Sequence, residues 1–376
     1  MININEIYPL DNKKERDQFI AFPFDLMIHD PNFVGQPRIA QNEMFKKSHP
    51  FYATAEVRFF TATDADGKMI GRIASVINKK HNEKHNEKVM FFGFTDFIDD
   101  KKVSKALINK VNEIAKETGM EILRGPVNPS TNYEAACLVN GFDDPPQIMM
   151  TYNPKYYKDH FDELGFNKSM DFFAYTRHIP DPMNPVIKKI ADRTEKKANI
   201  TYRKISKKNF QKDIETMQEL YNASWEDNWG FVPMTREEFL HTAKDLKQVL
   251  DEDFIIFAEI EGKPVGFAVA LPDFNQALIK IKNGKLFPFG IWHILRAKSY
   301  IDRFRVITLG ILPEYRKLGL GALLYYKLWK TAFDKGYREC EASWILENNK
   351  DMNAAMDRLD GKLYKTYRIY EQSICQ

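Results

Sequence analysis

The sequence predicts a duplicated protein of the α/β (α+β) class, with two tandem domains that each contain a mixed, mostly antiparallel sheet flanked by helices. Length, a repeated hairpin motif and one shared spacing support this prediction. The 376 residues exceed one average domain and suit two of about 180. An apolar content of 44% is enough for two real cores, so a disordered chain is not expected.

The repeat is clearest in two predicted β-hairpins. The stretches "DGKMIGRIASV" (66–76) and "EGKPVGFAVAL" (261–271) each consist of a tight turn that feeds a strand, and another strand pattern precedes each. Gly67 and Gly262 are 195 residues apart (262 − 67), and so are Leu164 and Leu359 (359 − 164). Two matches at one spacing indicate that an α/β domain has been duplicated.

Each half then continues in the same order. After its hairpin, the first half is predicted to have a strand, an amphipathic helix ended by Gly119, a second strand, a Pro- and Asn-rich loop, a short helix and a closing strand, at about 88–97, 101–118, 120–127, 128–155, 156–164 and 169–177. The second half has a matching strand, leucine-striped helix and strand at about 305–311, 319–335 and 339–346.

The second half also has features of its own. It starts with a predicted helix at 210–225, and a second helix follows Thr235, which forms a capping box with Glu238. An insertion of roughly thirty residues, 272–301, separates two of its strands. We therefore predict a first domain at 1–178, a linker at 179–198 with early prolines and later charges, and a second domain at 199–376.

Composition excludes several classes of function. Lys and Arg exceed Asp and Glu by only 55 − 52 = 3, which argues against a nucleic-acid binder. Cys137, Cys340 and Cys375 have no metal spacing and suit a reduced compartment. The N-terminus has no signal-peptide pattern, and no apolar run approaches the ~18 residues of a membrane span. We expect a soluble, cytoplasmic protein without a membrane partner. His81 and His85 alternate with Asn, Glu and Lys, which indicates a solvated loop and no metal site.

The most informative stretch is "ILPEYRKLGLG" (311–321), between a predicted strand and a predicted helix. A Gly-rich turn at a helix start presents several backbone N–H groups, and the helix dipole adds positive potential. Gly319 and Gly321 permit close approach of a phosphate, and Arg316 and Lys317 add charge. The stretch matches neither a P-loop nor a dinucleotide fingerprint, because Leu324 occupies the third glycine position of the latter.

The remaining pattern, R-x-x-G-x-G from Arg316 to Gly321, resembles the signature of the GNAT acyltransferase superfamily. The order of elements from about residue 200 onward fits that family, and in outline the first half resembles the same fold. The resemblance implies an acetyl-CoA or other acyl-CoA co-substrate, whose binding residues would be Ile311, Leu312, Arg316, Lys317, Leu318, Gly319, Leu320, Gly321, Ala322 and Asn349.

The first half offers an internal comparison at the same place. Its corresponding stretch, "TDFIDDKKVSKALINKV", has no glycine and puts Asp96, Asp99 and Asp100 near the helix start. Carboxylates there would occupy and oppose an anion site. We therefore expect the first domain to be a degenerate copy, with one cofactor bound per chain.

The resemblance also implies an N-acyltransferase mechanism. The pantetheine arm would pair with backbone at Ile311 and Leu312, and a main-chain N–H near Ile311 would polarise the thioester carbonyl. A primary amine would then attack and lose a proton. Glu347 is the first candidate base and Glu341 the second.

The acid that would protonate the leaving thiolate is less well marked. The tyrosine that the family often supplies falls on Met356 in this sequence, which cannot donate a proton. Tyr364, or alternatively Tyr367, is the expected substitute, although both also fit a packed strand. A thiolate leaves tolerably without an acid.

The acceptor is expected to be a small or amino-acid-like primary amine. Its site would be built from the early helices and the insertion, with Trp225, Asn228, Trp229, Phe231, Phe289 and Trp292 as candidate residues. Two other readings stay open: a non-catalytic module that senses acyl-CoA, and an aminoacyl-transferase that uses charged tRNA. The second needs no intact pyrophosphate turn, so the turn counts against it.

Overall fold

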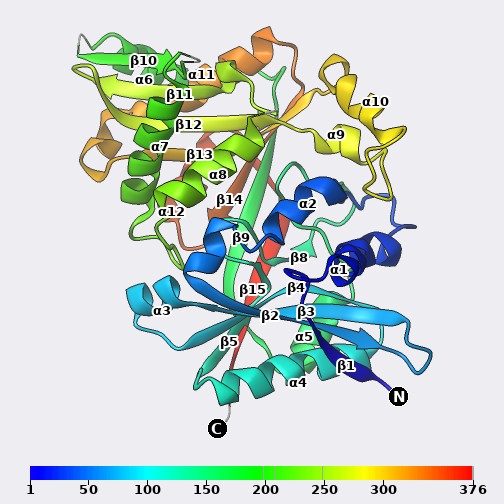
Figure 1. Ribbon diagram of the computed structural model, residues 1–376. Helices are drawn as coiled ribbons and strands as arrows, with labels where there is room; N and C mark the ends of the chain where they lie inside the picture. The colour runs from blue at the N-terminus through cyan, green and yellow to red at the C-terminus, as the bar shows by residue number, and fades with distance from the viewer. Residues whose placement is uncertain (198, 207, 248, 375–376) are drawn as a thin grey trace. The chain divides into compact units, whose positions relative to one another are not determined.

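The computed structural model describes residues 1–197, 199–206, 208–247 and 249–374 (Figure 1). Within them the chain forms two compact units. Unit 1 contains Met1–Asp171, Asn275–Ala297 and the chain from Lys365 onward, and unit 2 contains Phe172–Phe274 and Lys298–Tyr364. Cys375 lies outside the described residues.

Unit 1 is a sheet with helices on it. The strands lie in the order β1 (Asn3–Ile7), β2 (Ala55–Thr63), β3 (Met69–Asn78), β4 (Val89–Phe97), β5 (Ile122–Gly125) and the later part of β15 (Lys362–Ser373). All neighbours are antiparallel except β4 and β5, which are parallel and joined by α4 (Lys101–Glu117). The apolar stripe of α4 packs on the strands to form the main core of the unit.

Shorter elements complete unit 1. They are α1 (Lys13–Leu26), α2 (Arg38–Met44), α3 (Lys79–His85), α5 (Tyr157–Glu163), a 3-10 turn (Pro50–Ala53), the hairpin of β6 (Val127–Asn128) and β7 (Glu134–Ala135), β8 (Cys137–Asn140), α9 (Asn275–Leu278) and α10 (Gly290–Leu295). The last two come from the insertion that the sequence places in the second half.

Unit 2 repeats the same plan. Its strands lie in the order β9 (Asn167–His178), β14 (Glu339–Leu346), β13 (Arg303–Ile311), β12 (Lys263–Pro272), β11 (Ile255–Ile260) and β10 (Ile200–Lys204). Only β13 and β14 are parallel, and α11 (Leu320–Asp334) joins them. Its helices also include α6 (Pro185–Glu195), α7 (Phe210–Trp225), α8 (Arg236–Leu246) and α12 (Lys350–Arg358).

The hairpin prediction is confirmed in both halves. Gly67 has φ of +80° before β3, and Gly262 has φ of +76° before β12, so both occupy the left-handed region that glycine tolerates best. Thr235 and Glu238 form the predicted capping box at the start of α8. The order strand, helix, parallel strand also recurs as β4–α4–β5 and β13–α11–β14.

The two compact units differ from the two sequence halves in how each sheet is closed. The strand β9 ends the first half, but its residues from Phe172 belong to unit 2 and pair with β14. The strand β15 ends the second half, but its residues from Lys365 belong to unit 1 and pair with β5. The segments 1–178 and 199–376 therefore stay our proposal for the duplicated copies, while each unit takes its closing strand from the other copy.

The proposed linker, 179–198, contains a helix, α6, in which Ile187 and Ala191 are buried, because its apolar side chains pack in the cores of unit 2.

One local prediction was wrong. The stretch around His81, predicted as a solvated loop, is helix α3, capped by the Asn78 side chain and ended by a left-handed Asn86. His81 is only 3% exposed there.

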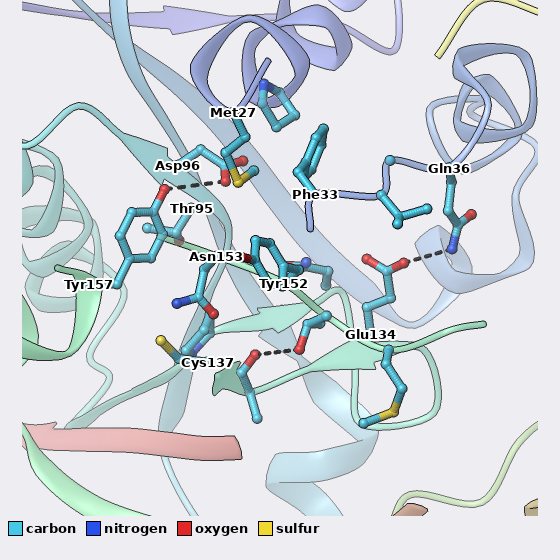
Figure 2. Close-up of a pocket in the computed structure, with 18 of the residues that line it drawn as sticks. Met27, Phe33, Gln36, Thr95, Asp96, Glu134, Cys137, Tyr152, Asn153 and Tyr157 are labelled. Atoms are coloured by element: carbon cyan, nitrogen blue, oxygen red, sulfur yellow. Dashed lines mark hydrogen bonds between the residues drawn. The ribbon is translucent and has the colours of Figure 1, made fainter. Parts of the chain in front are cut away.

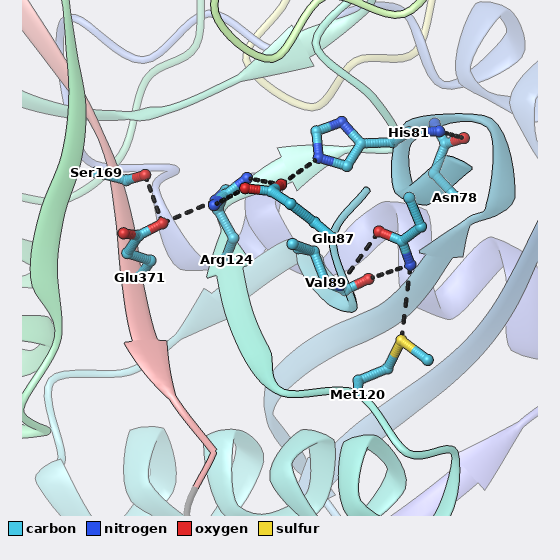
Figure 3. Close-up of polar contacts among 9 residues, drawn as sticks. Asn78, His81, Glu87, Val89, Met120, Arg124, Ser169 and Glu371 are labelled. Atoms are coloured by element: carbon cyan, nitrogen blue, oxygen red, sulfur yellow. Dashed lines mark hydrogen bonds and ion pairs between the residues drawn. The ribbon is translucent and has the colours of Figure 1, made fainter. Parts of the chain in front are cut away.

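His81 belongs to a polar network inside unit 1 (Figure 3). Its Nε2 lies 3.0 Å from Oε2 of Glu87, and Arg124 Nη1 donates to the same oxygen at 2.8 Å. Arg124 Nε also donates to Glu371 Oε2 at 2.9 Å, and Ser169 Oγ donates to that carboxylate. Burial lowers the pKa of His81 to about 4. The network joins α3 to β5 and β15 with a neutral imidazole.

This histidine predicts a pH dependence of stability. Between pH 6.5 and about 4 the unfolded chain binds a proton at His81 that the native protein does not bind. The free energy of unfolding should therefore fall as the pH is lowered through this window, with a contribution of up to about 3 kcal/mol from this residue. In urea unfolding, His81→Leu should flatten the slope between these two pH values. The same substitution at the exposed His29 is the control, and an unchanged slope in His81→Leu would contradict the assignment.

Candidate active site

The edge of β13 is open over its second half. β12 pairs with β13 as far as Ile311, but the ladder between β13 and β14 covers only Arg303–Val306 and Glu339–Ala342. Both strands continue beyond these pairs, so they separate after Val306. Along 307–311, backbone groups on this side lie outside the ladders of the described sheet. An extended ligand can pair with such an edge.

The start of α11 lies immediately after this edge. A 3-10 turn (Pro313–Leu318) leads to Gly319, which is the N-cap of α11 and carries no side chain that could accept a hydrogen bond. The first backbone N–H that bonds back to Gly319 is that of Leu323, at 3.1 Å. The preceding N–H groups of Leu320, Gly321 and Ala322 therefore point out of the helix end, where the dipole favours an anion.

The two glycines of this turn have different roles. Gly319 has φ of +87°, and a Cβ there would lie 2.5 Å from Thr194 Oγ1, so the fold requires glycine. A Cβ on Gly321 would meet nothing closer than Ile311 Cδ1 at 3.6 Å, which is an ordinary contact. Packing therefore does not require Gly321. Its glycine keeps the first turn of α11 bare, although glycine is a poor helix former.

The predicted cofactor residues next to the turn already have protein partners. Arg316 donates from Nε to the carbonyl of Ile311 at 3.3 Å and from Nη2 to the carbonyl of Ser224 at 3.0 Å. The N–H of Leu312 donates to Val265 at 3.0 Å. A ligand thus finds its open backbone before Leu312, and Arg316 offers positive charge from a fixed position. Lys317 is exposed beside it.

The same place in unit 1 is closed. The strands β4 and β5 also separate after a short parallel ladder, but Oδ1 of Asn128 accepts from the N–H of Phe94 at 2.5 Å. A Cβ on Gly93 would lie 1.9 Å from the carbonyl oxygen of Val127, so the protein itself fills this edge. Asp100 caps α4 by accepting from the N–H of Lys102 at 2.8 Å. Neither a bare strand edge nor a bare helix end is present at this place in the described part of unit 1.

A buried polar cluster lies where β13 and β14 separate. Glu341 is 0% exposed and stands opposite Arg305 in the register. One of its oxygens accepts from Ser343 Oγ at 2.5 Å and lies 3.4 Å from Arg305 Nε. The phenol of Tyr364 donates to its other oxygen. The structure thus brings together Glu341 and Tyr364, two residues that the sequence proposes for catalysis.

Arg305 and Ser343 are the members of this cluster that the sequence analysis missed. Arg305 Nε donates to Ser343 Oγ at 2.7 Å, and Nη2 donates to the Ser343 carbonyl at 3.0 Å. An arginine inside the apolar run "RFRVITLG" was the available signal, because a charged residue within a buried strand needs a partner.

The other proposed residues lie after β14. Glu347 follows the end of the strand with intermediate exposure, and its carbonyl accepts from the Asn353 amide at 3.4 Å. Asn349, a proposed cofactor residue, caps α12 by accepting from the N–H of Met352 at 3.1 Å. Met356 is buried at 2% exposure, so no phenol stands at that position.

The proposed acceptor residues divide into three groups: Trp225 at the end of α7, then Asn228, Trp229 and Phe231 in the segment that follows α7, and the pair Phe289 and Trp292 in the insertion. Trp225 stacks on Tyr221 with 4.9 Å between ring centroids, and a Cβ on Gly310 would lie 2.5 Å from its ring, so it contacts β13. Trp229 packs edge-on against Phe172 at 6.1 Å. Phe231 is 4% exposed and belongs to the core, and the carbonyl of Asn228 accepts from its N–H.

The third group, Phe289 and Trp292, lies in the insertion. These two side chains are 78% and 59% exposed and belong to unit 1. The structure therefore does not bring them together with the α7 aromatics in one compact unit.

Three buried polar atoms around the open edge have no hydrogen-bond partner within the described protein. They are Ser224 Oγ on α7, Thr308 Oγ1 on β13 and Trp344 Nε1 on β14. Buried polar groups are normally paired, because desolvation without a partner costs free energy. These atoms are available to a ligand or to water.

An open parallel-strand edge followed by an uncapped helix start defines the acyl-CoA-binding fold of the GNAT class. The model of the acetyltransferase (GNAT) family matches residues 214–360. The chain belongs to this family, as a tandem-domain member, and is an acyltransferase. The fold class and the family resemblance predicted from the sequence are confirmed.

Two relatives match almost the whole chain. Protein YghO of Escherichia coli K12 is 35% identical over 370 residues, which cover 96% of this chain and 94% of that protein. Bacterial ceramide synthase of Caulobacter vibrioides is 32% identical over 385 residues, covering 98% and 97%. A tandem GNAT protein from the clavulanic acid biosynthesis pathway has the same fold, with a TM-score of 0.57 and 11% identity over 100% of this chain and 99% of its own.

No helix in the described residues is both long and apolar enough to cross a membrane. Nor does this part of the chain gather three or more His, Cys, Asp or Glu side chains in a way that could hold a metal ion.

The contrast between the two glycines gives a prediction. Gly321→Val should weaken binding of acetyl-CoA by at least about tenfold, because a branched side chain covers the N–H groups at the helix start. Its thermal stability without ligand should stay nearly unchanged. Gly319→Ala should instead destabilise the protein by about 1–2 kcal/mol, because it forces alanine into a left-handed conformation.

Calorimetric titration with acetyl-CoA and thermal unfolding without ligand distinguish the two effects. A truncated thioester that lacks the pyrophosphate should bind equally well to the parent protein and to Gly321→Val. Full acetyl-CoA affinity in Gly321→Val would show that the turn does not hold the pyrophosphate.

Proposed function

We propose that unit 2 transfers an acyl group from acyl-CoA to a primary amine, and that the chain binds one acyl-CoA. Two open features of unit 2 support this proposal: the β13 edge at 307–311 and the uncapped start of α11. The corresponding strand edge and helix start of unit 1 are both occupied by the protein's own side chains. Coenzyme A needs both open features, since its pantetheine arm is extended and its pyrophosphate is an anion. Acetyl-CoA is the simplest donor.

In the proposed reaction, the amine nitrogen attacks the thioester carbonyl, a C–N bond forms and the C–S bond breaks. Backbone N–H groups of the open β13 edge stabilise the oxyanion that develops on the carbonyl oxygen. The amine loses one proton to Glu347 through water. The O–H of Tyr364, which donates to Glu341 before the reaction, turns to the sulfur and gives its proton to the thiolate. Glu347 then releases its proton to solvent, and the phenolate of Tyr364 takes up a proton from solvent.

Glu341 is better suited to position Tyr364 than to act as the base itself. It is fully buried and already bound by Ser343, Arg305 and Tyr364, so no face is left for an incoming amine. Glu347, the first candidate of the sequence analysis, therefore stays the proposed base, and Glu341, the second candidate, is proposed to position the phenol of Tyr364 instead.

The acceptor that we propose is a primary amine with a long apolar chain. One relative is named a ceramide synthase, and a ceramide is the amide of a long-chain amino alcohol. In unit 2, Trp225 contacts β13, and the rings of Trp229, Phe172 and Trp344 form a continuous aromatic set. Such a wall suits an apolar chain better than a small polar amine.

Release of free thiol tests this proposal. The purified protein should release thiol from acetyl-CoA or a longer acyl-CoA only when an amine is present, and mass spectrometry should identify the amide. A long-chain amino alcohol should give a kcat/KM at least about tenfold above that of ethanolamine, since burial of each CH2 contributes about 0.8 kcal/mol. A release rate that does not depend on the amine would leave only an acyl-CoA-binding or hydrolytic protein.

A variant of the acid distinguishes catalysis from binding in the same assay. Tyr364→Phe should lower kcat by about 10- to 100-fold with little change in acetyl-CoA affinity, because it removes only a proton donor. Tyr202→Phe, on the exposed edge strand β10, is the matched control.

A further inference from the structure

Unit 1 contains a cavity that the acyl-transfer site does not use. Its volume is about 140 Å³, close to the ~150 Å³ cavity that accepts benzene in another protein. Figure 2 shows it between α1, the end of β4, the β6–β7 hairpin and the segment 149–153. All of these elements belong to unit 1.

The cavity has an apolar side. Met27 and Phe33 reach it from α1 and the loop that follows, and Phe24 packs edge-on against Phe33 at 5.7 Å. Met149 and Met150 contribute flexible apolar side chains from another segment. This side can hold a short hydrocarbon group.

The opposite side carries two carboxylates in different states. Asp96 is already neutralised, because Arg72 donates to it at 2.7 Å. Glu134 is hydrogen-bonded by two amide side chains, Gln36, whose Nε2 donates to Oε1 at 2.7 Å, and Asn128. Within the described chain it has no ion pair, and the nearby Arg72, whose charge also acts on it, is already paired with Asp96. Burial raises the pKa of Glu134, although the side chain keeps some exposure. The carboxyl group of Glu134 is thus partly shielded from water and lines the cavity.

We propose that this cavity binds an organic ammonium ion with a short apolar group, the ammonium on Glu134 and the hydrocarbon between Met27 and Phe33. Among the described residues that line it, the cavity has two carboxylates, Asp96 and Glu134, and one cation, Arg72, so an ammonium supplies the second counter-charge, and the apolar wall supplies burial. Because the donor site of unit 1 is filled by Asn128 and Asp100, an amine bound here is held without being acylated. Unit 1 is then a copy that binds a ligand but no longer catalyses acyl transfer.

Hexylammonium is a suitable probe, and neutral hexanol is its matched control. Calorimetry on the full chain should show hexylammonium binding at least about tenfold more tightly than hexanol. Glu134→Gln should remove that difference, and Glu341→Gln in unit 2 should not.

Equal affinity for hexylammonium and hexanol, or full affinity in Glu134→Gln, would overturn the assignment. Glu134→Asp, which keeps the charge, should retain part of the preference if the first variant fails to fold. The result does not depend on acyl transfer in unit 2, because neither the probe nor the readout uses acyl-CoA.

An independent observation concerns the surface of the insertion. Phe287, Phe289, Trp292 and Leu295 are 68%, 78%, 59% and 66% exposed, and all four lie within nine residues on and before α10. Large apolar side chains gathered in this way mark an interaction surface.

The charge of the same segment favours an anionic partner. Between Asn275 and Ala297 there are three lysines and one arginine and no Asp or Glu, whereas the whole chain has 55 basic and 52 acidic residues. One of these lysines, Lys282, donates to the carbonyls of Asp30 and Pro31, so Lys280, Lys285 and Arg296 are the basic residues proposed for this surface. Aromatic side chains beside basic ones are typical of segments that lie in the interface of an anionic membrane. We propose that this surface docks on anionic phospholipid. This proposal departs from the sequence analysis, which expected no membrane partner because no apolar run is long enough to span a membrane. A surface that docks on a membrane needs no such run.

Co-sedimentation with vesicles tests this second proposal. The full chain should bind vesicles that contain phosphatidylglycerol and bind pure phosphatidylcholine at least about tenfold less, with the difference reduced at high salt. The double variant Phe289→Ser and Trp292→Ser should lose binding by about tenfold or more. Phe333→Ser on α11, 48% exposed, is the control. Unchanged binding by the double variant would contradict the proposal, and so would an oligomer in solution that dissociates only in that variant.

Discussion

The site depends on one constraint in the sheet of unit 2: β13 must satisfy its backbone on two sides but has a full-length partner on only one. β12 accompanies it to Ile311, whereas β14 leaves it after Val306. The separation exposes strand backbone and places the start of α11 at its end. The chain can leave the strand this sharply because Gly319 adopts a left-handed conformation against α6. The open edge and the bare helix end are therefore parts of one piece of backbone geometry.

The duplicated copy shows how little change removes such a site. Unit 1 has the same parallel pair and the same helix, yet one amide side chain, Asn128, satisfies the strand edge and one carboxylate, Asp100, satisfies the helix start. Both side chains accept hydrogen bonds from backbone N–H groups that a cofactor would otherwise bind. The fold survives such replacement because strand pairing and the apolar face of α4 do not depend on it.

Much of this could be predicted from the sequence, because the signals are local. The hairpins, the helices α4, α7 and α11, the capping box and the turn from Arg316 to Gly321 each follow from a few neighbouring residues. The exchange of closing strands could not, because β9 and β15 carry similar strand patterns and nothing local tells which sheet each one joins. The contact between Glu341 and Tyr364 was equally hidden, since it joins two strands through side chains. The cavity beside Glu134 draws on four separate segments, and its residues form no motif.

The exchanged strands have a consequence for how the protein is made. Unit 1 begins at the N-terminus, but its sheet is complete only when the residues from Lys365 have been synthesised. A nascent chain on the ribosome thus carries an unclosed first sheet, with one edge of β5 unpaired, while the residues between Gly125 and Lys365 are synthesised. Neither half can be inherited or expressed as a self-sufficient module, because each lacks a strand that the other encodes. If the gene were split between the halves, each product would have an incomplete sheet unless the two products assembled again.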